Sequence, residues 1–125
     1  MAPEKVAQAL AVMWRAGIAH GARVIAMTTM EAPYSDPTIP ATDTAAKAYE
    51  AQRLQLNQLM QREAGAAEFE GRLLLLDLAR ALPQWGLSPE ERGRYWDDGL
   101  HLTPAGYDWM AQILADVLLK QLASR

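Results

Sequence analysis

One short segment of the chain, residues 96–107, places an acidic side chain and an imidazole close enough to work together. Asp98 and His101 lie three residues apart across a turn that contains Gly99. At this spacing the carboxylate can accept a hydrogen bond from one ring nitrogen and leave the other nitrogen free. A histidine general base is held in one tautomer in this way. The spacing therefore indicates acid-base chemistry at His101.

The residues that follow predict a fixed position for this histidine. Thr103 is a favourable N-cap and Pro104 suits the first position of a helix. Apolar residues then recur at helical spacing: Met110, Ile113, Leu114, Val117 and Leu118. We therefore expect His101 just before a rigid helix that packs on the core.

The run Asp-Gly-Leu-His-Leu-Thr-Pro-Ala-Gly-Tyr, residues 98–107, resembles the C-terminal catalytic block of the SGNH (GDSL-type) esterases and lipases. In that family an Asp three residues before a His completes a Ser-His-Asp triad. The resemblance implies that His101 is the general base and that Asp98, in preference to Asp97, orients it. It also implies a serine ester hydrolase that cleaves a small-molecule carboxylic ester through an acyl-enzyme, without a cofactor. The simpler alternative is that Asp98 and His101 only close a turn above a helix.

The chain shows no residue that suits the role of nucleophile. The family carries its serine in a Gly-Asp-Ser-type box and its oxyanion donors in later Gly and Asn blocks, and none of these boxes occurs here. Ser35 lies in a proline-rich loop, Ser88 suits a helix cap and Ser124 is near the C-terminus. Asn57, the sole asparagine, falls within a predicted helix. We therefore expect a fragment that contains base and orienter only and is inactive alone.

Composition excludes several classes of function. With 50% hydrophobic and 22% charged residues in 125, the chain has ordinary globular composition. A net charge of -3 with scattered Lys and Arg argues against nucleic-acid binding. There is no cysteine, and the two histidines lie too far apart in sequence to suggest a metal-binding spacing. A metal-dependent hydrolase is therefore the least favoured hypothesis, behind the esterase and the interaction domain described below. No apolar run approaches membrane-spanning length, and the compartment stays open.

Periodicity and turn residues predict an alternation of helices and strands. Helices are expected at residues 3–19, from Thr42 or Asp43 to about Ala66, in a short turn after Ser88, and from Pro104. In the second of these helices, Tyr49 is expected on the inner side and Arg53 on a solvated face. Strands are expected at residues 23–30 and 71–78, the first of them a buried parallel strand. The fold class is α/β with a short parallel sheet and flanking helices. By resemblance, residues 1–125 form a single partial SGNH domain, part of a three-layer α/β/α, flavodoxin-like fold.

Four side chains outside the His101 segment are weaker candidates. Tyr34 and Ile39 lie in the proline-rich loop at residues 31–40, which borders the substrate cleft in the resembling family, so both are candidate pocket walls. A solvated connector is at least as good an interpretation of each of these two residues. His20 is expected to bond the last carbonyls of the first helix. Asp77, near the C-terminal end of the second strand, is a candidate to orient the catalytic loop, but a structural hydrogen bond to loop backbone is the favoured interpretation.

A sheet of only two parallel strands would leave a strand edge open. We therefore expect the isolated chain to self-associate through that edge. The same edge supports the alternative function, a non-catalytic interaction domain derived from this fold that binds by β-augmentation.

Overall fold

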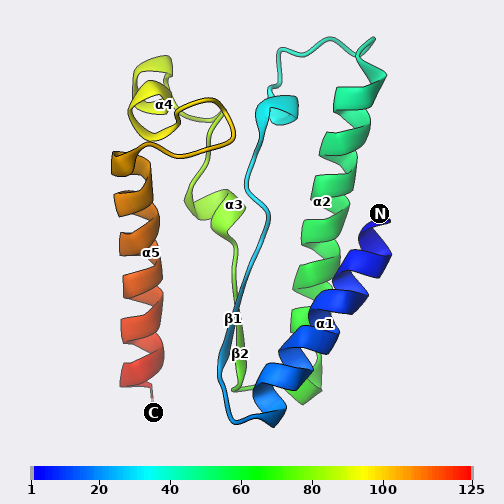
Figure 1. The fold of residues 1–125 in the computed structure, drawn as a ribbon, viewed down its shortest axis with the longest axis vertical. Helices are drawn as coiled ribbons and strands as arrows, with labels where there is room; N and C mark the ends of the chain where they lie inside the picture. The colour runs from blue at the N-terminus through cyan, green and yellow to red at the C-terminus, as the bar shows by residue number, and fades with distance from the viewer. Residues whose placement is uncertain (1, 125) are drawn as a thin grey trace. The chain divides into compact units, whose positions relative to one another are not determined.

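The structure is a computed structural model that describes residues 2–124. It is a mixed α/β fold in which two short strands form one parallel sheet. Two 3-10 turns, Pro33–Ser35 and Ala67–Phe69, lie in the connections. The elements of Figure 1 follow in chain order: α1 Pro3–Ala19, β1 Val24–Met27, α2 Thr44–Ala64, β2 Leu73–Leu76, α3 Leu78–Ala81, α4 Pro89–Tyr95 and α5 Pro104–Ala123. The α/β class with a short parallel sheet is thus confirmed.

The chain forms two compact units. The first, here called the sheet unit, comprises Met1–Thr29 and Ile39–Leu78. The second, called the loop unit, comprises Met30–Thr38 and Ala79–Arg125 and contains α4 and α5. The single partial domain expected over residues 1–125 stays a prediction.

The sheet unit pairs β1 with β2 in parallel, with Val24 opposite Leu73 and Met27 opposite Leu76. The N–H of Val24 donates to the carbonyl of Arg72 (2.9 Å), and the N–H of Thr28 donates to Leu76 (3.1 Å). Both strands were expected, although each is shorter than its predicted range. Figure 1 shows α1 and α2 side by side in this unit.

An aromatic pair lies at the centre of the sheet unit's core. The rings of Trp14 and Phe69 meet edge to face at 5.8 Å, a favourable geometry for the aromatic quadrupoles. Ala11, Ala26 and Met60 complete the buried cluster. The predicted helix at residues 3–19 is confirmed, and His20 bonds the carbonyl of Ala16 through Nδ1 (2.9 Å), as expected.

The inner face of α2 differs from the prediction. Tyr49, expected inside, is 58% exposed, whereas Arg53, expected on the solvated face, is 7% exposed. The buried stripe of this helix is Ala46, Arg53, Asn57 and Met60, spaced at helical intervals. Hydropathy misplaced the face because two of its buried residues are polar and find their partners elsewhere in the unit. Asp43, not Thr42, caps the helix by accepting from the N–H of Ala46.

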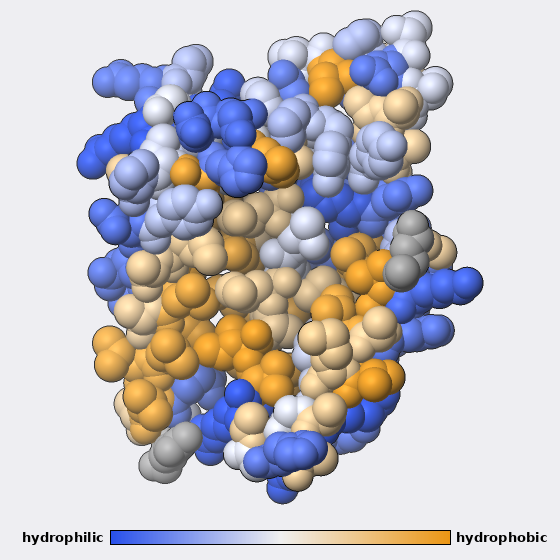
Figure 2. All heavy atoms as spheres, viewed as in Figure 1, coloured by the Kyte–Doolittle hydropathy of each residue, from blue (hydrophilic) through white to orange (hydrophobic). Residues whose placement is uncertain are grey.

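In the loop unit, the buried residues include Leu82, Gln84, Trp96 and Leu102. The cap of α5 is Thr103, with Pro104 in its first turn, as predicted. The apolar stripe of α5 is less covered than expected: Met110, Ile113, Leu114 and Val117 are half-buried, and Leu118 is exposed. Figure 2 shows apolar side chains gathered over the C-terminal half of this helix. Within residues 2–124 no helix combines the length and apolarity needed to cross a membrane.

Candidate catalytic dyad

The segment that carries the dyad is a closed turn whose two ends are held together by backbone bonds. Trp96 and Leu102 form an antiparallel bridge, and the N–H of Asp97 donates to the carbonyl of His101 (2.9 Å). The N–H of Thr103 donates to Tyr95 (3.0 Å), which ties the end of α4 to the start of α5. Residues 96–103, called the His101 loop from here on, are therefore positioned by their own neighbours in sequence.

Two glycines are required by this geometry. Gly99 has a φ of +83°, in the left-handed region that favours glycine, and so permits the tight turn between Asp98 and His101. Gly106 lies in the first turn of α5, where a Cβ would be 2.1 Å from the carbonyl oxygen of Tyr95. Helices α4 and α5 can approach this closely only because residue 106 has no side chain.

Within the loop, Asp98 and His101 make the predicted contact. The distance from Asp98 Oδ2 to His101 Nδ1 is 2.7 Å. The other carboxylate oxygen, Oδ1, accepts from the N–H groups of Leu100 (2.9 Å) and His101 (2.6 Å). Three hydrogen bonds therefore fix the plane of this carboxylate, and Asp98 is the carboxylate that bonds the imidazole.

Each member of the dyad shifts the pKa of the other. The hydrogen bond from the His101 ring, followed by the backbone N–H groups of His101 and Leu100, holds the pKa of Asp98 well below its ordinary value of 3.8. The same Asp98 bond and charge raise the pKa of His101 above 6.5, with a smaller contribution from Asp97. Both shifts favour the ion pair of Asp98 with protonated His101.

The dyad lies at the surface, with 63% of the His101 side chain and 53% of the Asp98 side chain exposed. Within residues 2–124 the His101 Nε2 has no hydrogen-bond partner. The three serine hydroxyls are engaged elsewhere: Ser35 accepts from Ala32, Ser88 accepts from Glu91, and Ser124 donates to Gln121. The described part of the chain therefore supplies a base and its orienter but no serine bonded to that base.

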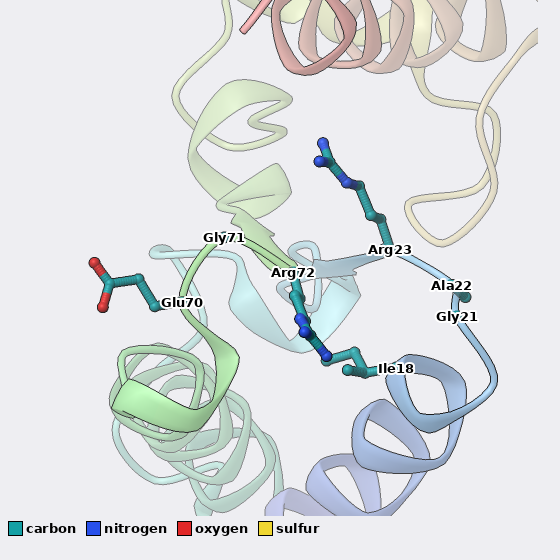
Figure 3. Close-up of a pocket in the computed structure, with 7 residues that line it drawn as sticks. All are labelled: Ile18, Gly21, Ala22, Arg23, Glu70, Gly71 and Arg72. Atoms are coloured by element: carbon teal, nitrogen blue, oxygen red, sulfur yellow. The ribbon is translucent and has the colours of Figure 1, made fainter. Parts of the chain in front are cut away.

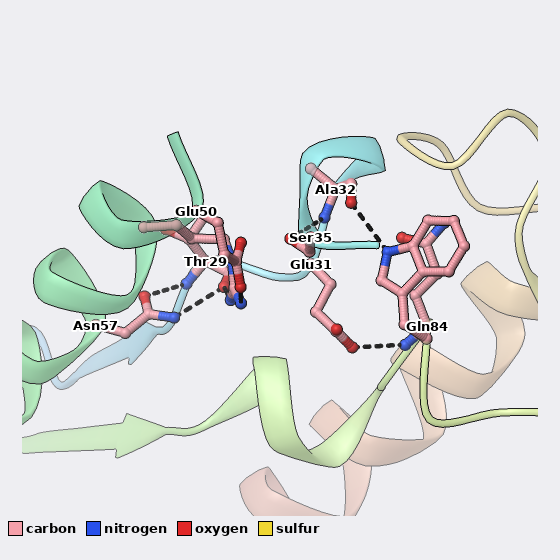
Figure 4. Close-up of polar contacts among 9 residues, drawn as sticks. Thr29, Glu31, Ala32, Ser35, Glu50, Asn57 and Gln84 are labelled. Carbon is pink, nitrogen blue, oxygen red and sulfur yellow. Dashed lines mark hydrogen bonds and ion pairs between the residues drawn. The ribbon is translucent and has the colours of Figure 1, made fainter. Parts of the chain in front are cut away.

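A second polar cluster, at the C-terminal end of β1, was missed in the sequence. The side chain of Asn57 accepts from the N–H of Thr29 (2.8 Å) and donates to the Thr29 carbonyl (2.9 Å), as Figure 4 shows. Arg53 donates to the same carbonyl (3.0 Å). Thr28 Oγ1 donates to Asp77 Oδ1 (2.8 Å), so Asp77 makes a structural hydrogen bond at this strand end, and the bond to loop backbone expected of it stays a prediction. We call these five residues the strand-end cluster.

Arg53 also pairs with Glu50, which compensates the charge of a guanidinium that is largely removed from water. The strand-end cluster therefore holds the backbone at the end of β1 in place. The one available signal was the helical spacing of Arg53 and Asn57 with Ala46 and Met60.

Each unit has a cavity. The cavity of the sheet unit, about 440 Å³, lies at the amino ends of the strands beside Gly21, Gly71 and Arg72 (Figure 3). Open α/β sheets place their sites at the opposite, carboxyl ends. The cavity of the loop unit, about 390 Å³, includes Asp98 in its lining. Tyr34 and Ile39, the weak candidates for pocket walls, are half-buried and line neither cavity.

Comparison of the chain with protein-family models, curated proteins and solved structures finds no match. Among residues 2–124 no three His, Asp or Glu side chains are grouped so that they could hold a metal ion.

Proposed function

We propose that Asp98 and His101 are the orienter and general base of a serine ester hydrolase of the SGNH type. The observation that carries the proposal is the dyad itself. Asp98 holds the Nδ1 side of the imidazole at 2.7 Å and leaves Nε2 without a partner among the described residues. In acyl transfer, Nε2 takes the proton of the serine as the hydroxyl attacks the ester carbonyl. The same nitrogen then returns the proton to the leaving alcohol, while the carboxylate stabilises the imidazolium.

The serine and the oxyanion donors belong, in this proposal, to a polypeptide segment outside these 125 residues. The three serine hydroxyls of the described chain already have other partners. By the same proposal, the two-stranded sheet is part of a larger flavodoxin-like sheet. The 125-residue chain alone is then expected to lack esterase activity.

The test begins with the intact mass and N-terminal sequence of the protein from its native source. The proposal expects a longer protein with about 90 further residues, or about three strand-helix units of some 30 residues each, including a serine at a strand-to-helix turn. In that protein, a fluorophosphonate probe should label the serine, and p-nitrophenyl butyrate should be hydrolysed. His101→Ala should reduce both by a factor of about 10³ or more, and Asp98→Asn should reduce turnover severely without unfolding the protein.

His20→Ala is the matched control, because His20 is the other histidine and is also exposed. It should leave labelling and hydrolysis unchanged. A native protein that begins at Met1 or Ala2, or full labelling of the His101→Ala protein, would remove the basis of the assignment.

The open edge of β1 favours a second candidate function, a non-catalytic interaction domain. Along β1 the N–H groups of Val24 and Thr28 point to β2, so those of Ile25 and Met27 point to the other edge. In the described sheet of two strands this edge has no strand partner, and such an edge can pair with a second copy of the chain.

Sedimentation velocity over a range of concentrations tests this candidate. Self-association should weaken in Met27→Lys, which places a charge on the edge strand, and persist in Met13→Lys, which changes an exposed methionine of α1. A monomer at every concentration would exclude this role for the edge.

A further inference from the structure

One residue that lines the cavity of the loop unit has a buried side-chain oxygen that the described chain leaves unsatisfied. Gln84 is 1% exposed and lines this cavity, and its Oε1 is buried without a hydrogen-bond partner among residues 2–124. A buried amide oxygen without a partner costs about 1–3 kcal/mol, so such atoms are rare in folded proteins. This acceptor is therefore a point where a ligand can donate a hydrogen bond.

The main chain of Gln84 is held on both sides. Its N–H donates to the carboxylate of Glu31 (2.9 Å; Figure 4), and its carbonyl accepts from Arg92 Nε (3.2 Å). A Cβ at Gly99 would lie 3.3 Å from Gln84 Nε2, so the His101 loop packs directly against this amide. The side chain that carries the unsatisfied oxygen therefore starts from a backbone position held by hydrogen bonds, and it lies next to the loop that carries Asp98.

The walls of the cavity define the chemistry of its ligand. Trp85 and Trp96 donate their indole N–H groups to backbone carbonyls, of Ala32 and Pro83 respectively, so the rings contribute apolar surface. Arg92 stacks on Trp85 with its guanidinium carbon 4.6 Å from the ring centre. The Arg92 Nε and Nη2 already donate to the carbonyls of Gln84 and Leu87.

Charges of both signs in the lining of the cavity disfavour an ionic ligand. Asp97 and Asp98 line it together with Arg92, so an anion would face two carboxylates and a cation would face the guanidinium. The ligand that best fits this lining is a neutral molecule. Its hydroxyl would donate to Gln84 Oε1, and its carbon skeleton would pack on the indole rings. A volume of about 390 Å³ is in the range of small-molecule sites.

We propose that this cavity binds the hydroxylated alcohol part of the ester substrate, with Gln84 Oε1 accepting a hydrogen bond from a ligand hydroxyl. That the ligand is a substrate rests on the proposed esterase function. Binding of a hydroxylated molecule in this cavity does not depend on that function. Gln84 selects esters of polyols over esters of simple alcohols of the same length. It touches the ligand and does not take part in bond breaking.

The experiment measures binding to the 125-residue chain by ¹⁵N–¹H NMR, with the Trp85 indole and Gln84 backbone signals as reporters. Glycerol 1-monobutyrate is compared with propyl butyrate, which has the same carbon skeleton without the two free hydroxyls. The wild-type chain should bind the glycerol ester about 5- to 10-fold more tightly, the worth of one net hydrogen bond. Equal affinities, or no shift at Trp85, would overturn the proposal.

Gln84→Met keeps the length of the side chain and removes the acceptor. It should abolish the preference for the glycerol ester while binding of propyl butyrate is retained. Gln112→Met, at an exposed glutamine of α5 in the same unit, should keep the preference. If Gln84→Met does not fold, the comparison of the two esters on the wild-type chain still decides the matter.

Neither binding measurement depends on turnover. Failure of the Gln84 site therefore leaves the triad proposal standing, and failure of the triad proposal leaves the binding result standing.

Discussion

The dyad of the loop unit and the strand-end cluster of the sheet unit are both polar, but they are held in opposite ways. Asp98 and His101 are more than half exposed, and the hydrogen bonds that hold them join residues at most four apart in the chain. Asn57 is 8% exposed, and its bonds to Thr29 span 28 residues. The first cluster is fixed by local backbone geometry and the second by tertiary packing. A reactive group needs access to a substrate, whereas a buried cluster at a strand end mainly stabilises the fold.

The largest expected effect comes from the glycine that lets α4 and α5 meet. In Gly106→Ala the new Cβ would be 2.1 Å from the Tyr95 carbonyl oxygen, so the two backbones must separate. We expect a loss of about 3 kcal/mol from the unfolding free energy, at the upper end of ordinary overpacking. Urea unfolding measures this loss of stability, and amide hydrogen exchange of residues 96–106 shows whether the loop opens more often. The His101 pKa should also move back toward 6.5, because the turn that holds Asp98 loosens.

Gly93→Ala is the control for this substitution. Gly93 lies in α4, and a Cβ there would meet no atom within 4 Å. Because alanine is the better helix former, this variant should be unchanged or more stable by up to about 1 kcal/mol. Equal stability of the two variants would show that the loop does not depend on the close approach at Gly106.

The second largest loss of stability is expected from a substitution in the sheet unit that leaves the dyad unchanged. Asn57→Ala removes both bonds to Thr29, although Arg53 still donates to the Thr29 carbonyl. The N–H of Thr29 then lacks its partner, and we expect a loss of about 2 kcal/mol in chemical denaturation. Gln58→Ala, an exposed neighbour on the same helix, should change stability by less than about 0.5 kcal/mol.

The His101 ring signals should be the same in wild type and Asn57→Ala, since every bond of the dyad lies within the loop unit. A shift of those signals would mean that the two clusters are coupled, which the contrast between them does not predict.

The same contrast explains what could be predicted from the sequence. The Thr103 cap, the Asp98–His101 contact and the His20 contact each join residues three or four apart, so the chain order alone specifies them. Arg53 was expected on the solvated face of its helix and no contact was predicted for Asn57, because their partners at the end of β1 lie 24 and 28 residues away. Gln84 was missed for a similar reason: the Glu31 carboxylate that accepts from the Gln84 N–H is 53 residues away in the chain. Helical periodicity of apolar residues cannot detect a buried face made partly of polar side chains.

The smallest expected change in stability, and the most specific test of the dyad, is Asp98→Asn. Asparagine keeps the shape of the side chain but removes the charge that raises the His101 pKa. We expect that pKa, measured from the ring-proton shifts of His101 in an NMR titration, to fall toward 6.5, whereas His20→Ala should leave it raised.

The sign of the effect on stability follows from the two shifts. The raised His101 pKa stabilises the folded chain fully below pH 6.5, and this contribution is lost as pH rises through the folded-state pKa. The lowered Asp98 pKa contributes above pH 3.8 and is lost as pH falls toward its folded-state value. The pair therefore stabilises most between about pH 4 and 6.5, but only weakly, because both groups are exposed to solvent. The difference in Tm between wild type and Asp98→Asn should be largest within that window and smaller above it. A difference that persists unchanged at pH 9 would mean that Asp98 holds the turn through its backbone bonds alone and does not act through the charge of His101.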